Sequence, residues 1–334
     1  MERMTMDASQ AGGTWRRAIA TAWLLCAPTL ASAQSGLEQG IRLFDGRRYD
    51  SARSQITAFA EVNPGSAAAA FYLGRIALVE RDLGAATRWL ERATRLDGNG
   101  AAYHYWLGQA YARQALTSSR FRQFFIAKKV KQEFLRAVEL DPQNPEFRVG
   151  LFQFYVMAPG VVGGGLDKAR VEADELYKRD RLRGLLARGF LEEKQNRTEA
   201  AEALYKEAVA SFPDDPDAYN ALGLFYTRVK RYDDAFSVFE RILERKPEAL
   251  QPYYYLGRVG ALSGLRLDRS EEVLKHYIAH LPGEDDPPLS HAHTRLGTIY
   301  ERKGDAAAAR QEYEMALKLE PDYAEARGAL GRIR

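Results

Sequence analysis

Hydrophobic residues three and four positions apart recur along most of the chain and are separated by short polar turns. Such apolar stripes are typical of amphipathic helices. Glycines recur within this pattern at intervals of 34 residues, in two series: Gly40, Gly74, Gly108 and Gly189, Gly223, Gly257. A 34-residue period accommodates two helices and a turn, so the pattern predicts stacked helix-turn-helix units.

Other residues recur in register with the glycines. The second unit carries Leu73, Ala86, Leu90 and Ala93. The sixth unit carries Tyr219, Leu222, Tyr226, Ala235, Phe239, Ile242 and Pro247. The eighth unit carries Leu296, Tyr300, Ala309, Tyr313, Ala316 and Pro321. This pattern resembles the tetratricopeptide repeat (TPR) family over essentially all of residues 34–334. The resemblance implies an all-α, right-handed α-solenoid of about eight repeats with a C-terminal capping helix.

The matched residue types have packing roles. Glycine and alanine allow the two helices of a repeat to approach closely, and proline ends the second helix. The resulting domain prediction is a signal peptide over residues 1–33, a solenoid over 34–323 and a capping helix over 324–334. Insertions near residues 114–130, 158–166 and 282–289 lengthen the third, fourth and seventh repeats.

The third-repeat insertion interleaves phenylalanines with basic residues. These are Arg120, Phe121, Arg122, Phe124, Phe125, Lys128, Lys129 and Lys131. Such interleaving suggests nucleic acid or an anionic membrane surface. The favoured interpretation is a lengthened helix pair whose aromatic side chains pack inward and whose lysines face solvent.

The fourth repeat contains the stretch Ala158-Pro159-Gly160-Val161-Val162-Gly163-Gly164-Gly165. A similar APG-VVGGG loop is associated with a group of exported bacterial TPR proteins. A phosphate-binding loop would require a lysine and a hydroxyl residue after the last glycine, but Leu166 and Asp167 follow here. We therefore expect a loop with unusual backbone angles. The proline-rich, acidic insertion at 282–289 is expected to be a surface loop or a slight hinge.

Residues 1–33 have the pattern of a secretory signal peptide. Arg16 and Arg17 precede a short apolar run, and Ala31-Ser32-Ala33 fits the small-residue cleavage site. The mature chain is therefore predicted to begin at Gln34 and to be periplasmic or secreted. The open alternatives are a twin-arginine signal, lipid attachment at Cys26 and an uncleaved anchor.

Charge and cysteine content narrow the function classes. The net charge of +3 becomes +2 once residues 1–33, with three arginines and two acids, are removed. Such a weak overall field makes nucleic acid an unlikely partner. Cys26 is the only cysteine, so a chain cleaved after Ala33 would have no disulfide and no thiolate metal site.

No motif indicates catalysis, and no cofactor is predicted. His276 and His280 lie four residues apart on a predicted helix, but the glutamate of the zinc-protease motif is missing. The repeat frame places His276 where other repeats bury Ala93, Ile242 or Ala316, so we expect a core histidine and no metal site. Acid pairs such as Asp214-Asp215 are expected to cap helices.

The resemblance to the TPR family implies a concave groove lined by the first helix of each repeat. Positions at the family's offsets give the predicted partner-binding residues: Phe71, Arg75, Tyr105, Gln109, Arg113, Gln153, Asn220, Arg228, Tyr254 and Arg258. Arginine, asparagine and tyrosine suit a ligand with carboxylates.

The sequence thus favours a protein-interaction scaffold of the bacterial cell envelope that binds a protein or peptide and is not an enzyme. A glycan or small-ligand binding module, or an unrecognised enzyme, is the alternative.

Overall fold

The computed structural model describes residues 35–280, 282–283 and 286–333, and the predicted signal peptide lies outside these residues. The described residues form helices joined by short turns, with no strand among them. This confirms the predicted all-helical solenoid. None of the helices in these ranges combines the length and apolarity needed to cross a bilayer. The chain divides after Asn99 into two compact units, which are described separately.

The first unit contains two helix pairs. Residues 35–45 are helical and precede α2 (Tyr49–Val62), and α3 (Ala67–Val79) pairs with α4 (Leu83–Leu96). Phe44, Ile56, Leu73 and Ile76 are buried together in its core. These residues come from both pairs, so neighbouring repeats share one core.

The second unit continues the pairing through thirteen α-helices of the described chain. Their bounds are α5 (Ala101–Leu116), α6 (Arg120–Leu140), α7 (Pro145–Met157), α8 (Leu166–Arg179), α9 (Arg181–Lys194), α10 (Thr198–Ser211), α11 (Pro216–Arg228), α12 (Tyr232–Arg245), α13 (Leu250–Ser263), α14 (Leu267–Ile278), α15 (Leu289–Lys303), α16 (Ala306–Leu319) and α17 (Ala324–Arg332). Ala326 and Ala329 of α17 are buried, and α17 packs against α15 and α16. The last helix therefore covers the preceding pair, as a capping helix does.

The repeated glycine allows the two helices of a pair to approach closely. A Cβ atom placed on Gly223 of α11 would lie 2.4 Å from Cζ of Phe239 on α12, inside van der Waals contact. Gly297 has the same relation to Tyr313, at 2.7 Å from its Cε1. Both rings are fully buried, so the absence of a side chain on the first helix makes room for a large one on the second.

The turn inside each regular repeat contains a residue in the left-handed region, seven positions after the helix glycine. These residues are Arg47, Arg81, Asn196, Lys230, Gly264 and Gly304, with φ between 56° and 82°. Only glycine adopts this conformation without a steric cost, so four of the six turns carry some backbone strain.

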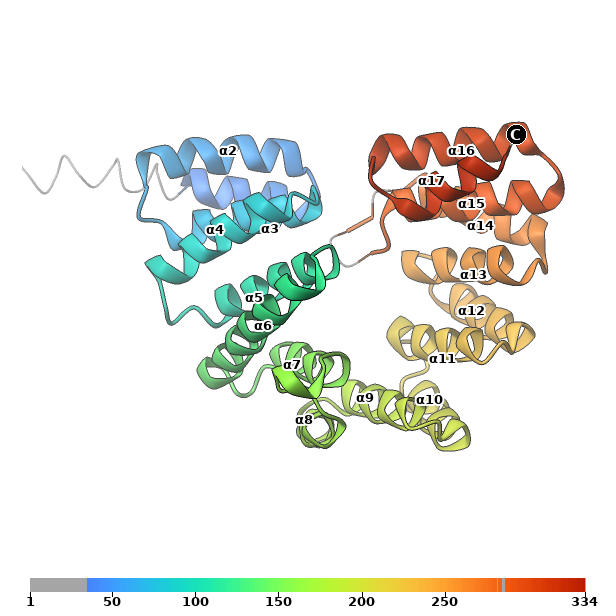
Figure 1. The fold of residues 1–334 in the computed structure, drawn as a ribbon, viewed down its shortest axis with the longest axis horizontal. Helices are drawn as coiled ribbons and strands as arrows, with labels where there is room; N and C mark the ends of the chain where they lie inside the picture. The colour runs from blue at the N-terminus through green and yellow to red at the C-terminus, as the bar shows by residue number, and fades with distance from the viewer. Residues whose placement is uncertain (1–34, 281, 284–285, 334) are drawn as a thin grey trace, which may run out of the picture. The chain divides into compact units, whose positions relative to one another are not determined.

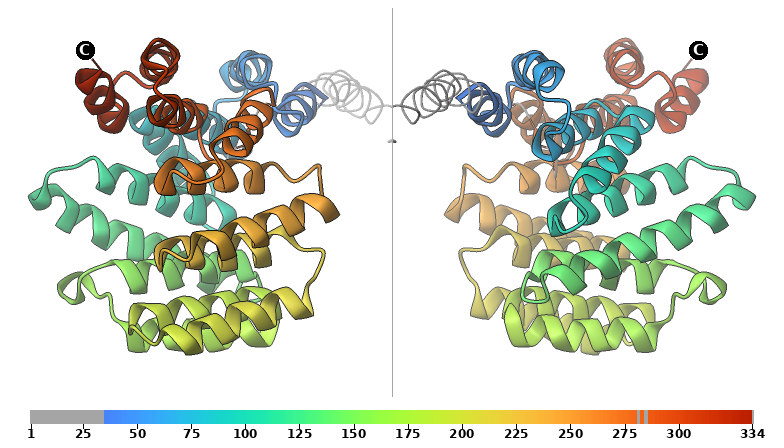
Figure 2. Two further views of the ribbon diagram at one scale, coloured as in Figure 1. Left: turned by 90° about the vertical axis from the view of Figure 1, so that its right-hand side faces the viewer. Right: turned by 90° about the vertical axis from the view of Figure 1, so that its left-hand side faces the viewer.

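The third-repeat insertion lengthens α6 to 21 residues. The expectation that its phenylalanines pack inward is wrong for Phe121 and Phe125, which are 76% and 53% exposed. The buried residues of α6 are Val130, Phe134 and Ala137, all in its C-terminal part. The physical reason is that the added turns extend past the stack, where no helix covers them. Figure 2 shows the teal-green turn between α5 and α6 projecting beyond its neighbours.

The fourth-repeat loop has the unusual backbone angles expected of its glycines. It contains a short 3-10 turn, η1 (Gly160–Val162), followed by Gly163 at φ 97° and Gly165 at φ 153°. A Cβ on Gly164 would lie 1.8 Å from the carbonyl oxygen of Ala158. The loop therefore requires glycine for its own backbone, which explains the motif without a ligand.

Candidate functional site

The first helices of successive pairs form one continuous layer in the second unit. Each first helix contacts the next one in the series α5, α7, α9, α11, α13, α15 and α17. In the described residues the second helices do not form such a layer of close backbones; side chains bridge them instead, as where Arg269 of α14 pairs with Glu240 of α12 at 2.8 Å. Figure 1 shows these pairs stacked one on the next, with first helices following first helices. We call the surface of this layer that faces away from the second helices the first-helix face.

Two of the predicted residues lie in the first unit, on α3. Phe71 is buried, and the guanidinium carbon of Arg75 lies 5.6 Å from the centroid of its ring. The same guanidinium lies 4.7 Å from the ring of Phe44. Arg75 is therefore held by cation–π contacts within its own unit.

Four further predicted residues lie on α5 and α7. Tyr105 is buried, and its hydroxyl accepts a hydrogen bond of 3.0 Å from Nε2 of Gln109. Arg113 is half-buried two turns after Tyr105, and no described carboxylate lies within ion-pair distance of it. Gln153 on α7 is exposed. In this part of the face, Arg113 and Gln153 present polar groups to solvent, whereas Tyr105 is part of the packing.

The most distinctive polar group of the face is Asn220 on α11. Its side chain is only 6% exposed, and its Nδ2 donates a 3.0 Å hydrogen bond to Oε1 of Gln251 at the start of α13. Its Oδ1 is buried and has no hydrogen-bond donor among the described residues. A buried amide oxygen without a donor is costly, by about 1–3 kcal/mol. Asn220 therefore has an unused acceptor between two neighbouring first helices.

Three polar side chains of α13 follow one another at helical spacing. Gln251, Tyr255 and Arg258 lie four and three residues apart and are each half-buried, so they occupy one stripe of the helix. Burial is the main cause of the raised pKa of Tyr255. The neighbouring Tyr254 raises this pKa further, whereas the positive charge of Arg258 lowers it.

Arg258 differs from the other arginines nearby in having no ion-pair partner among the described residues. Arg228 on α11 pairs with Glu193 on α9, and Arg295 on α15 pairs with Glu325 on α17. Tyr254, also predicted, is buried beside Tyr255 and Tyr277, with ring centroids 5.5 Å from each. Among the predicted residues of α11 and α13, Arg258 is thus an open cation, Arg228 a paired cation and Tyr254 a core tyrosine.

Sequence reasoning missed Gln251, Tyr255 and Glu193. Gln251 lies two helical turns before Arg258, so the heptad spacing on α13 would have indicated it. Glu193 ends the first helix of the preceding repeat, and its role depends on how two repeats stack. Nothing in one repeat of the sequence reveals such a pairing.

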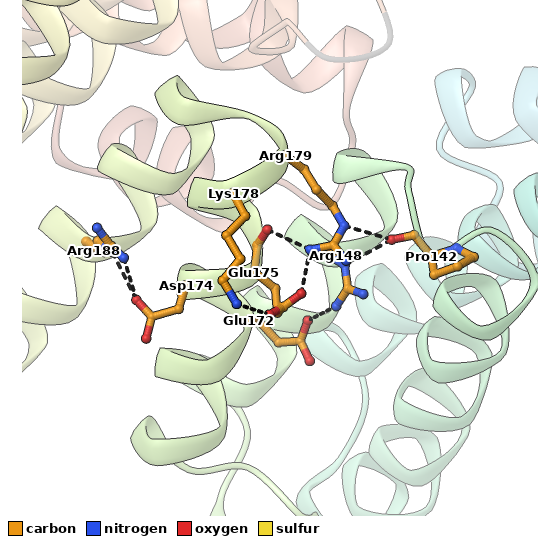
Figure 3. Close-up of polar contacts among 8 residues, drawn as sticks. All are labelled: Pro142, Arg148, Glu172, Asp174, Glu175, Lys178, Arg179 and Arg188. Atoms are coloured by element: carbon orange, nitrogen blue, oxygen red, sulfur yellow. Dashed lines mark hydrogen bonds and ion pairs between the residues drawn. The ribbon is translucent and has the colours of Figure 1, made fainter.

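The densest polar network of the fourth repeat is internal (Figure 3). Nη1 of Arg148 on α7 lies 2.9 Å from Oε2 of Glu172 on α8, and both side chains are largely buried. Arg148 and Arg179 both donate to the carbonyl oxygen of Pro142, at 3.2 and 3.1 Å. Hydrogen bonds from Lys178 and then Arg179 hold the pKa of Glu175 at about 2. These charges satisfy one another and fix α7 against α8, so this network leaves no group for a ligand.

The predicted core position of His276 is wrong. His276 is exposed and stacks on Tyr253 with ring centroids 4.1 Å apart, while Tyr277 takes the buried place. The reason is a one-residue shift: Leu274 contacts Gly257 at a spacing of 17 residues, whereas regular repeats use 16. Burial is the main cause that lowers the pKa of His276, and His280 adds to it. In the described ranges, no three acidic, histidine or cysteine side chains form a metal-binding group.

Comparison with known protein families matches several parts of the chain to the same kind of repeat. Residues 37–101 and 186–265 match one tetratricopeptide repeat model, and residues 290–323 match a second. Together the two matches cover more than half of the chain.

One curated relative and two solved structures show the range of similarity. The relative is the interferon-induced protein with tetratricopeptide repeats 2 of Cricetulus griseus, 26% identical over 44% of this chain and 31% of its own length. A tetratricopeptide repeat protein from Parabacteroides merdae is 14% identical with a TM-score of 0.48, covering 77% of this chain and 94% of the other. A thermophilic TPR protein in Thermus thermophilus is 17% identical with a TM-score of 0.46, over 68% and 98%. The chain thus spans about a third of the curated relative that it matches.

Proposed function

Because the chain belongs to the tetratricopeptide repeat family, whose members generally mediate protein–protein interaction, we propose that it is a binding scaffold of the bacterial cell envelope. Its ligand is a peptide or protein segment that carries a carboxylate. The segment lies across the first-helix face at α11 and α13.

The observation that carries this proposal is the buried amide of Asn220. Its Oδ1 has no donor within the described chain, and its Nδ2 is held by Gln251. Because Oδ1 is shielded from solvent, the N–H group of a peptide backbone would satisfy it only as the side chains that cover it move aside on binding. Because Gln251 fixes the orientation of the amide, the acceptor is positioned before the ligand arrives, which reduces the entropy lost on binding.

The carboxylate of the ligand is assigned to Arg258. This side chain is half-buried on the same stripe as Gln251, and its guanidinium has no carboxylate partner among the described residues. A guanidinium binds a carboxylate through two parallel hydrogen bonds, which fixes both position and direction. Removing one partner of such a pair at an interface costs about 2–5 kcal/mol.

The envelope location rests on residues 1–33, which lie outside the described residues. The test is the N-terminus of the protein isolated from its cells, measured by mass spectrometry. We expect Gln34, as the small-residue site at Ala31-Ser32-Ala33 predicts. A terminus at Met1 or Met6 would exclude cleavage and with it this part of the proposal.

Capture from an envelope fraction tests the binding face. The immobilised protein should retain a defined protein, and both Asn220→Ala and Arg258→Glu should weaken its retention at least about tenfold. Lys318→Glu, which makes the same charge change on the exposed surface of α16, is the matched control and should retain the partner as well as wild type. Equal retention by all four proteins would show that the first-helix face is not the binding surface.

A further inference from the structure

The projecting end of the α5–α6 hairpin exposes apolar side chains that a TPR core does not use. We call residues 116–129 the basic tip. Of the 15 phenylalanines in the chain, Phe121 and Phe125 are the two whose side chains are exposed, and Leu116 beside them is 83% exposed. Covering this apolar area would release water, so the basic tip is a favourable contact surface.

The aromatic rings of the basic tip form a small cluster. The ring of Phe125 lies edge-on to those of Phe121 and Phe124, with centroids 5.1 and 5.5 Å apart. Nζ of Lys128 lies 4.5 Å from the centroid of Phe124. The rings are therefore held in place by one another and by a cation, and they project as a unit rather than as separate flexible side chains.

The charge around this cluster is of one sign. Residues 100–132 contain no aspartate or glutamate but include Arg113, Arg120, Arg122, Lys128, Lys129 and Lys131. The whole chain, in contrast, carries a net charge of only +3. No described carboxylate pairs with Arg120 or Arg122, both of which are exposed. The basic tip is thus a local positive field in a nearly neutral molecule.

The neighbouring fourth-repeat loop extends the apolar surface. Met157 and Val161 are 69% and 77% exposed. η1 contacts α6, and Lys131 Nζ lies 2.8 Å from the position of a Cβ on Gly163. Val161 in the loop and Met157 at the end of α7 therefore add two exposed apolar side chains, and the turn that holds Val161 lies against α6.

We propose that the basic tip docks this protein onto the surface of an anionic lipid bilayer. Phenylalanine, leucine, valine and methionine side chains enter the acyl boundary, while the surrounding arginines and lysines contact lipid phosphates. The tip projects and has apolar side chains at its end, which suits a soft, extended surface. A nucleic acid would use the cations but not the exposed leucine, valine and methionine. This surface does not include α11 or α13, where the proposed peptide lies, so the inference goes beyond the proposed function and does not depend on it.

Vesicle flotation tests the proposal with the chain that begins at Gln34, which contains every described helix. The protein should float with mixed phosphatidylcholine and phosphatidylglycerol vesicles at physiological ionic strength and remain free of pure phosphatidylcholine. Each cation at an anionic surface strengthens association by about fivefold, so the double variant R120E/R122E should bind at least about 25-fold more weakly. The double variant F121S/F125S should bind about tenfold more weakly and lose the binding that persists at high salt.

Two controls separate docking from general charge effects. R88E/K318E changes the charge equally on exposed positions of α4 and α16, neither of which pairs with a described carboxylate, and should float as wild type does. Because the only cysteine is Cys26, a Ser119→Cys variant of this chain takes a single polarity-sensitive dye at the tip. Its emission should shift to the blue on anionic vesicles, whereas a dye at Ser237→Cys on α12 should not. The proposal would be overturned if the wild type did not float, or if the tip variants bound vesicles as well as the control does. It would also be overturned if the tip bound nucleic acid or an acidic protein but not vesicles.

Discussion

Arg228 of α11 donates two hydrogen bonds to Glu193 of α9, from Nε to Oε1 at 2.5 Å and from Nη2 to Oε2 at 2.7 Å. This bidentate pair joins the first helices of two neighbouring repeats. It also means that the predicted cations of the first-helix face are not equivalent, because one of them already binds a carboxylate of the protein itself.

Charge reversal should therefore have different effects on stability at Arg228 and Arg258. Arg228→Glu places two carboxylates together and should lower the free energy of unfolding by about 1 kcal/mol. Arg258→Glu breaks no described ion pair and should change it by no more than about 0.5 kcal/mol. Urea denaturation of both variants measures the difference. The swap R228E/E193R should restore stability, and a swap no more stable than R228E would show that the pair does not contribute.

The left-handed turn position holds lysine in one repeat and glycine in another, so exchanging these residue types should change stability in opposite directions. Lys230 (φ 59°) and Gly304 (φ 82°) occupy equivalent turns after α11 and α15. Lys230→Gly removes steric strain and should raise stability, whereas Gly304→Lys introduces it and should lower stability by about 1 kcal/mol. Melting temperatures test both, and two changes of the same sign would contradict the strain argument.

The helix glycines predict a large packing effect at one position and none at another. Gly223→Ala forces a methyl group against the buried ring of Phe239, 2.4 Å from its nearest atom, and should cost about 1–3 kcal/mol. Gly328→Ala in α17 meets no atom within 4 Å, so it should be neutral or stabilise the helix. Chemical denaturation distinguishes them. Equal effects would show that close approach is not the role of the repeated glycine.

Acid should weaken the contact between α14 and α15. Hydrogen bonds from Lys275 and then Lys303 hold the pKa of Glu271 at about 2, below its value in an unfolded chain. A lowered pKa adds stability above about pH 4.5, and this stability is lost as the pH falls toward 2. Glu271→Gln should cost about 1 kcal/mol at neutral pH, after solvent screening, and almost nothing near pH 2. Glu314→Gln, exposed on α16, is the control; a pH-independent cost of Glu271→Gln would contradict the assignment.

The sequence was sufficient to predict those features of the structure that depend on residues within one repeat. The spacing of Gly223 and Phe239 within a single helix pair indicated their close packing, and the glycines after Pro159 indicated unusual backbone angles. Both features are determined by residues near one another in the chain, so a repeated pattern reveals them.

The sequence was insufficient where structure depends on register or on the end of the stack. One extra residue before α14 moved His276 to the surface and Tyr277 into the core. Phe121 and Phe125 have the spacing of an amphipathic helix, but no neighbouring helix reaches them. The pair between Glu193 and Arg228 requires the stacking of two repeats, which a single repeat does not encode.

Site-specific photo-crosslinking tests the first-helix face most directly. A benzoylphenylalanine at Leu262, exposed on α13 one turn after Arg258, should crosslink the protein retained from the envelope fraction. The same group at Ser237, exposed on the second helix α12, should not. A crosslink from position 262 that Arg258→Glu abolishes is the result that the proposal predicts. A crosslink from position 237 with none from position 262 would place the partner on the second helices and contradict the proposal.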